Sequence, residues 1–376
     1  MDSKDSHDNR NIKNTVIKRA SFIRTIENFP ISWEFPPTCS FHDFNAGKRC
    51  GYGQACQKCR ERELTAKNGH TSKFEMNHNV KCSLGIYPNC INSGNNGYVS
   101  LCLEFTELNR MEIMALCKFS ILNVDGKDEF KSVLGVEKFN AHKSSYCLQR
   151  FIKRDDLREK KSIVLPDDRL TVCFEIFYLF CDGEYISGVS ETTHIVGPFN
   201  RFLNDMCGML NSSEFYDYII KVGESEIRVH KCILASRSEV LREMLKNKST
   251  KHESDVIEIN DFPLEVVKEM INYLYTGTSP RIDEVAIEML EIAEKYKLEG
   301  LKFITTESLF KSLNVENVCY YLEKSELCSA EILKEFCIRY IYLNADEVVK
   351  SENWKRIVNS YPLLVDRIFK VTAGID

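Results

Sequence analysis

This sequence of 376 residues lacks the features that would place it in a membrane, in the secretory pathway or on nucleic acid. Its longest apolar run, Leu170–Phe180, is far shorter than the roughly 20 residues that cross a bilayer, and it contains Glu175. Residues 1–14 are polar without an apolar core, so they do not resemble a secretory signal. The net charge of −5 gives no general attraction to nucleic acid or to an anionic membrane surface. We therefore expect neither as a partner.

Catalytic motifs are also missing. The sequence has no phosphate-binding glycine loop, no glycine-flanked serine of the hydrolase type, and no pair of histidines spaced for one helix face. We expect no enzymatic activity and no cofactor. With 43% hydrophobic and 28% charged residues, the chain has the composition of globular domains, and its length predicts two or three of them.

Cysteine is abundant, with 16 residues, yet no secretory signal accompanies it. We expect these residues to be thiols in a reducing compartment and not a disulfide framework. One close pair, Cys56 and Cys59, lies in a segment with four more candidate ligands around it: Cys39, His42, His70 and Cys82. Because structural zinc sites commonly use two close pairs, we favour an exposed flexible loop here and expect no metal, with zinc as the alternative.

The clearest local pattern begins at Asp217. The segment Asp217–Val222 is rich in β-branched residues, and Gly223–Ser225 follows as a turn. Ile227 and Val229 then alternate with polar residues. This pattern predicts an antiparallel hairpin.

Helical patterns alternate with one more strand up to Leu309. Val256–Ile259 is the predicted strand. Pro263 fits the first turn of a helix, and Gly277 supplies its left-handed stop. We expect a further helix over Glu284–Leu301. The whole region predicts a mixed α+β domain.

The first half of the chain has a different pattern. Its clearest predicted strands are Tyr98–Phe105, Ala115–Asn123 and Leu170–Phe180, and turn-rich stretches separate them. Several strands at such spacing favour a separate domain that folds as an antiparallel β-sandwich.

Specific motifs in the second half resemble the BTB (POZ) domain. They are HKCILASRS at His230–Ser238, YTG at Tyr275–Gly277 and AEKYKLEGLK at Ala293–Lys302. The resemblance implies a protein-interaction module that usually dimerises. Within this motif His230 is expected to close a buried hydrogen bond and not to act as a base.

The first half resembles the TRAF-like MATH domain at Cys117–Asn123, Arg150–Leu157 and Leu165–Ile176. A MATH domain followed by a BTB domain is the arrangement of the MATH–BTB family of speckle-type POZ proteins. That resemblance implies that the MATH domain holds a target peptide while the BTB domain dimerises and binds cullin-3. The assembly then serves as the substrate adaptor of a ubiquitin ligase that marks targets for proteasomal degradation.

The resemblance also predicts the domain limits. In order they are a disordered tail (1–15), a MATH domain (16–188) with an inserted loop near 44–69, a linker and dimerisation helix (189–211), a BTB/POZ domain (212–310), and a helical extension (311–376) that resembles a 3-box and a truncated BACK segment. The chain shows no basic nuclear import signal, so we expect a cytoplasmic location and leave a nuclear one open.

The resemblance implies a substrate-peptide groove at six positions, Cys102, Cys117, Phe139, Lys143, Tyr146 and Leu148. Cys102 and Cys117 stand where the family has aromatic side chains, and Leu148 replaces another. Losing rings removes flat apolar contact area. We expect the groove to bind a different peptide motif; the alternative is that peptide binding is lost.

Dimerisation is expected to involve Ile233 and the connector before the BTB-like domain. Phe202, Met206 and Met209 lie at i, i+4 and i+7, which places them on one helix face. We favour a dimer contact for this stripe, with the chain itself or a related BTB protein as partner. The alternative is that the stripe packs on its own domain.

The cullin-contact loop departs from the family pattern. The family has a hydrophobic residue, any residue and then glutamate, where this chain has Ser249, Thr250 and Lys251. A hydroxyl replaces the apolar anchor and the charge is reversed, which weakens the expected cullin contact. A dimeric scaffold or antagonist that does not bind cullin is the alternative function.

Overall fold

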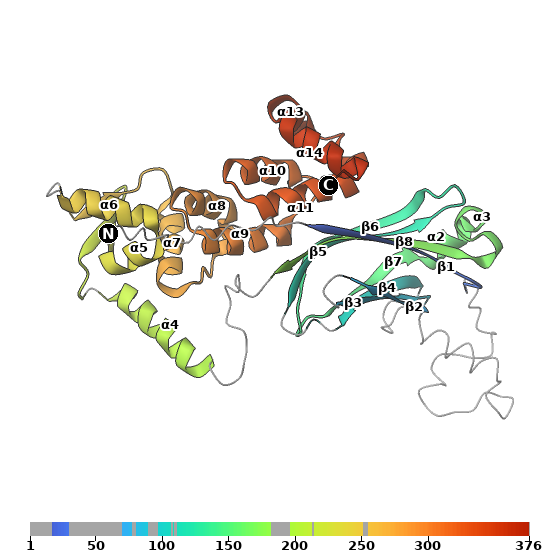
Figure 1. Ribbon diagram of the computed structural model, residues 1–376, viewed down its shortest axis with the longest axis horizontal. Helices are drawn as coiled ribbons and strands as arrows, with labels where there is room; N and C mark the ends of the chain where they lie inside the picture. Colours follow the sequence, from blue (N-terminus) through green and yellow to red (C-terminus); the bar gives the residue numbers. More distant parts are fainter. Residues whose placement is uncertain are drawn as a thin grey trace, which may run out of the picture. The chain divides into compact units, whose positions relative to one another are not determined.

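The computed structural model describes residues 17–29, 70–76, 80–88, 97–106, 108, 111–181, 196–212, 214–250 and 255–375. The chain forms two compact units (Figure 1). The N-terminal unit spans Ile17–Cys181, and the C-terminal unit is described from Val196 onward.

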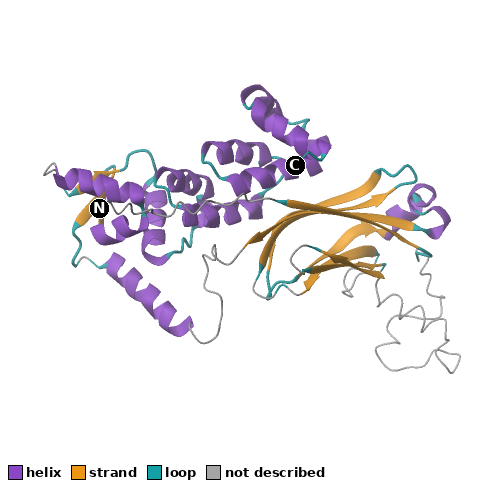
Figure 2. Ribbon diagram, in the orientation of Figure 1, coloured by secondary structure: helices purple, strands orange, loops and turns teal. Residues whose placement is uncertain are grey.

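The described residues of the N-terminal unit form two four-stranded antiparallel sheets (Figure 2). The first has the order β1 (Lys18–Ile26), β8 (Leu170–Cys181), β5 (Glu112–Leu122) and β6 (Asp128–Phe139). The second has the order β2 (His70–Glu75), β3 (Lys81–Tyr87), β4 (Tyr98–Thr106) and β7 (Ser145–Lys153). The predicted antiparallel β-sandwich is confirmed.

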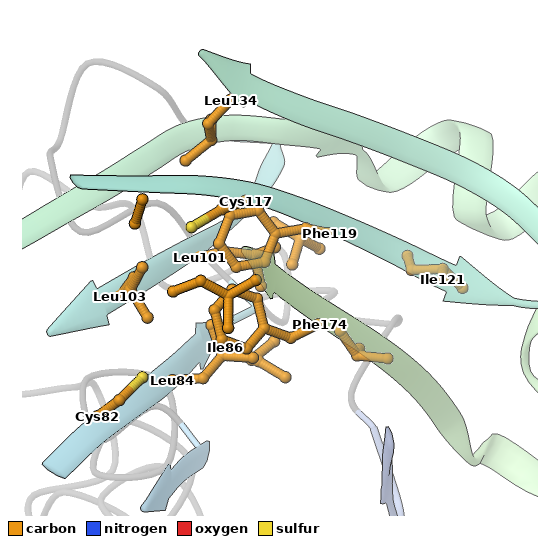
Figure 3. Close-up of a cluster of buried hydrophobic side chains, with 14 of the residues drawn as sticks. Cys82, Leu84, Ile86, Leu101, Leu103, Cys117, Phe119, Ile121, Leu134 and Phe174 are labelled. Carbon is orange, nitrogen blue, oxygen red and sulfur yellow. The ribbon is translucent and has the colours of Figure 1, made fainter. Parts of the chain in front are cut away.

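The core of this unit lies between the two sheets. Along β5, every second residue from Ile113 to Ile121 is buried in this core, as the two-residue period of a strand requires. Phe119 on β5 packs against Phe174 on β8 with 5.0 Å between the ring centroids, and Leu101 on β4 lies in the same cluster (Figure 3).

Short helices connect β7 to β8. They are α2 (Arg154–Glu159), α3 (Lys161–Val164) and the 3-10 turn η2 (Pro166–Asp168). Leu157, Val164 and Leu165 from this connection are buried in the sandwich core. The connection therefore closes the core at one end.

The C-terminal unit contains a small mixed sheet. The hairpin strands β9 (Tyr218–Val222) and β10 (Ser225–Val229) pair antiparallel, and β11 (Val256–Glu258) pairs parallel to β9. Gly223 in the turn has a φ of 57°, a conformation that costs glycine little. This hairpin confirms the prediction.

Helices make up the rest of the described unit. They are α4 (Val196–Asn211), α5 (Lys231–Arg237), α6 (Glu239–Thr250), α7 (Leu264–Thr276), η4 (Ile282–Glu284), α8 (Ala286–Lys295), α9 (Glu299–Ser312), α10 (Val318–Leu327), α11 (Glu331–Leu343), α12 (Ala345–Val348), α13 (Glu352–Ser360) and α14 (Pro362–Ala373). Gly277 ends α7 in the left-handed conformation, as predicted. Ile220, Val267, Met270 and Met289 join sheet and helices in one buried core.

The predicted single helix Glu284–Leu301 is wrong. The structure has η4, α8 and α9, with a break over Tyr296–Leu298 where Lys297 adopts a φ of 51°. The break lets the Leu298 N–H donate to the Ala293 carbonyl, and both Tyr296 and Leu298 are buried. An unbroken helix could not turn both side chains into the core.

No helix in the described part of the chain has the length and apolar character that crossing a membrane requires.

Candidate interaction surfaces

Two of the six predicted groove residues lie in the core of the sandwich. Cys117 is 1% exposed and Phe139 is 0% exposed. Figure 3 shows Cys117 beside Phe119 in the interior. Phe139 packs against Phe105 with 4.6 Å between the ring centroids. Neither side chain is therefore available to a peptide in this structure.

Two more groove residues lie on β7, the last strand of its sheet. Tyr146 is opposite Leu103 and Leu148 is opposite Leu101 on β4, so both point toward the core and are half-buried against it. Burial raises the pKa of the Tyr146 hydroxyl, and the carboxylate of Glu137 adds to the shift. The structure thus brings Tyr146 and Leu148 to one edge of the sandwich.

Lys143 lies in the turn that leads into β7. Its Nζ atom is 2.6 Å from Glu137 Oε2, and its side chain is largely exposed. The side chain of Asn140 accepts hydrogen bonds from the N–H groups of His142 and Lys143, which fixes the turn. Lys143 therefore presents a positive charge beside the β7 edge.

Cys102 has an unexpected partner. It lies on the outward face of β4 and forms a disulfide with Cys147 on β7, with 4.1 Å between their Cα atoms. The expectation that all cysteines are thiols is wrong for this pair. The pairing with Cys147 was not predicted because it depends on the strand register, which the sequence does not give and which places Cys147 opposite Cys102.

The residues of the BTB-like motif have structural roles. His230 is buried, its N–H donates to the Tyr275 hydroxyl at 2.9 Å, and its Nδ1 is 2.8 Å from the same oxygen. The Tyr275 hydroxyl therefore contacts both the backbone and the ring of His230, which ties the start of α5 to the end of α7. Burial raises the pKa of Tyr275 to about 12. The predicted buried hydrogen bond of His230 is confirmed.

The stripe on α4 divides between two environments. Met206 and Met209 pack against the core of the C-terminal unit, and α4 contacts α7. Phe202, on the same helix face, is 55% exposed. Ile233 on α5 is half-buried against the same core. The apolar stripe therefore continues beyond the surface that its own domain covers.

The cullin-contact positions are described only in part. Ser249 and Thr250 belong to the last turn of α6, but only their backbone is described, and Lys251 lies outside the described residues. The predicted cysteine-rich insertion near 44–69 also lies outside them. Cys82, one of its candidate zinc ligands, is buried in the sandwich core, and burial raises its pKa to about 12. The part of the chain that the structure describes contains no cluster of metal-ligating side chains.

The two units define a class of protein. Each has its own core, so the chain belongs to the proteins that are built from two separately packed modules.

Known proteins specify the family. The family model of the MATH domain matches residues 54–176, and that of the BTB/POZ domain matches residues 207–313. TD and POZ domain-containing protein 2 of Mus musculus is 33% identical over 303 residues, which cover 79% of this chain and 82% of that protein. The chain belongs to the MATH–BTB family.

Solved BTB domains are also similar to part of the chain. The BTB domain of zebrafish PATZ1 is 20% identical with a TM-score of 0.27, and covers 32% of this chain and 99% of its own. The BTB domain of human gigaxonin is 23% identical with a TM-score of 0.26, and covers 32% of this chain and 94% of its own.

Proposed function

We propose that the protein is a substrate-recognition subunit of a cullin-3 type ubiquitin ligase. In this proposal the MATH unit binds a target and the BTB unit dimerises and binds the cullin. The carrying observation is that a MATH sandwich and a BTB domain, each with a separate core, share one chain. Binding the target and the ligase by one adaptor raises their effective concentration, which accelerates ubiquitin transfer without chemistry by the adaptor.

The β7 edge is the surface we assign to the target. As the end strand of its sheet, β7 offers backbone groups on one side to an extended peptide. Tyr146 and Leu148 supply apolar contact beside it, and Lys143 supplies a positive charge. This arrangement suits an extended segment with apolar anchors and an acidic or polar neighbour.

Self-association is assigned to α4. Met206 and Met209 hold the helix on its own domain, so Phe202 is positioned with more than half of its surface in water. Covering such a ring in a second copy removes apolar area from water, which favours association. A dimer then carries two target-binding units, and avidity strengthens binding to targets with repeated motifs.

A second candidate function is a dimeric scaffold or antagonist that does not bind cullin. The sequence Ser249, Thr250, Lys251 favours it, because the apolar anchor is missing and the charge is reversed. Losing a central anchor costs about 2 kcal/mol or more, which corresponds to at least a thirtyfold loss of affinity.

Titration with the N-terminal region of cullin-3 tests these proposals. The full chain is compared with Ser249→Met plus Lys251→Glu, and with Lys246→Glu as a control that makes the same charge change within α6. The adaptor function predicts saturable binding that the double variant strengthens at least tenfold and the control does not. Binding of the native chain at nanomolar strength would refute the argument from the loop, and no binding by either chain would favour the scaffold.

A further inference from the structure

The disulfide lies where no backbone hydrogen bond joins the two strands. In antiparallel strands, the Cα atoms of directly opposed residues are about 5.5 Å apart at hydrogen-bonded pairs and about 4.5 Å apart at non-hydrogen-bonded pairs. The Cα distance of 4.1 Å places Cys102 and Cys147 in the second kind. The neighbouring pairs, Leu101 with Leu148 and Leu103 with Tyr146, are then the hydrogen-bonded ones. In agreement, the Phe105 N–H donates to the Ser144 carbonyl two positions further on.

The pair is accessible to a solution thiol. Cys147 is exposed, Cys102 is half-buried, and both lie on the sheet face that points away from the core. Cys82, Cys117 and Cys181 of the same unit are buried thiols. Reagents in solution therefore reach the Cys147 sulfur and not these buried thiols.

We propose that Cys102 and Cys147 form a reversible redox lock that holds the edge strand β7 on β4. In the described sheet, β7 has one neighbouring strand, β4. In the oxidised form the disulfide joins these two strands covalently and keeps them together. In the reduced form this cross-link is gone, and noncovalent contacts such as the backbone ladder and the half-buried Tyr146 and Leu148 hold this end of β7, so the strand opens more often. The lock itself does not depend on the proposed function. A role of this opening in regulating target binding does rest on the proposed function.

The redox step balances with a dithiol as reductant. One thiolate of the dithiol attacks Cys147 Sγ, the protein S–S bond breaks, and Cys102 leaves as a thiolate that takes a proton. In the resulting mixed disulfide, the second thiolate of the reagent attacks the reagent sulfur that is bonded to Cys147 Sγ. Cys147 leaves as a thiolate and is also protonated. The protein disulfide has gained two electrons and two protons, and the dithiol has become a cyclic disulfide. A disulfide oxidant reverses the sequence.

Hydrogen exchange of the full chain in reduced and in oxidised dithiothreitol tests the lock. Alkylation and mass spectrometry report the state of the two cysteines. We expect the pair to convert in both directions, and the amides of Tyr146 and Leu148 to exchange at least tenfold faster in the reduced form. The double variant Cys102→Ser plus Cys147→Ser should exchange at the reduced rate in both buffers.

Cys232→Ser, which removes an exposed cysteine on α5, is the matched control and should keep the full redox response. Equal exchange of the β7 amides in the two states would overturn the lock, and so would a pair that does not re-form in the oxidised reagent. The readout needs neither cullin nor target, so failure of the proposed function leaves the result on the lock unchanged.

Discussion

The replacement Phe174→Ala tests whether the two units are separate folding units. Phe174 is 0% exposed, its ring centroid is 5.0 Å from that of Phe119 and 6.1 Å from that of Phe22, and β8 is a central strand of its sheet. Truncating a buried phenylalanine costs about 3–5 kcal/mol. With ring contacts on two sides, we expect about 4 kcal/mol. At a slope near 2 kcal/mol per M, the midpoint of the N-terminal unit falls by about 2 M urea.

Native-state hydrogen exchange over a urea series measures this change separately for peptides of each unit. Peptides from the N-terminal unit should lose protection at lower urea, while those from α7 and α8 remain unchanged. Met270→Ala, at a 0% exposed position in the other core, is the matched control and should show the reverse pattern. Equal shifts in both units, or a change below 1 kcal/mol for Phe174→Ala, would refute the account of two independent cores.

Three further predictions concern the C-terminal unit. Glu335→Gln leaves the buried guanidinium of Arg339 without this carboxylate and should lower the free energy of unfolding by about 3 kcal/mol in urea denaturation. The exposed Glu352→Gln should change it by less than about 0.5 kcal/mol. Equal effects of the two variants would contradict this prediction. Burial alone would raise the pKa of Glu335, but Arg367 and Arg339 outweigh burial and hold the pKa below 4.5. This stabilisation is therefore present above pH 4.5 and is lost as the pH falls through the folded-state pKa. The free energy of unfolding of the native chain should fall more steeply in that range than that of Glu335→Gln, and parallel curves would refute the prediction. Phe202→Asp should halve the mass seen by light scattering at an unchanged melting temperature, and an unchanged dimer would exclude this ring from the interface.

The strands and the end of α7 at Gly277 could be predicted because they follow from local chemistry. The apolar runs of β5 and β8, buried over most of their length, and the glycine after α7 each depend on neighbouring residues alone. The break at Tyr296–Leu298 could not be predicted in the same way. The pattern of α8 continues into it, and only packing of α9 on α8 shows why the helix ends.

The interaction surfaces were harder to predict because they depend on register. Family resemblance placed Cys117 in a groove, yet its alternation with Ala115 and Phe119 directs it to the core. Met114 and Leu116 on the opposite face of β5 are also apolar and buried, so the sequence alone does not tell which face meets the core between the sheets. Pairing Cys102 with Cys147 required knowledge of which residues face each other across β4 and β7. One sequence does not contain that information in a readable form.

Sedimentation of the full chain mixed with the N-terminal region of cullin-3 tests the central claim most directly. If the chain is a dimeric adaptor, the mixture should contain a species with the mass of two chains and two cullin fragments. A chain that sediments as a dimer alone at every cullin concentration, even with Ser249→Met plus Lys251→Glu, would contradict the account.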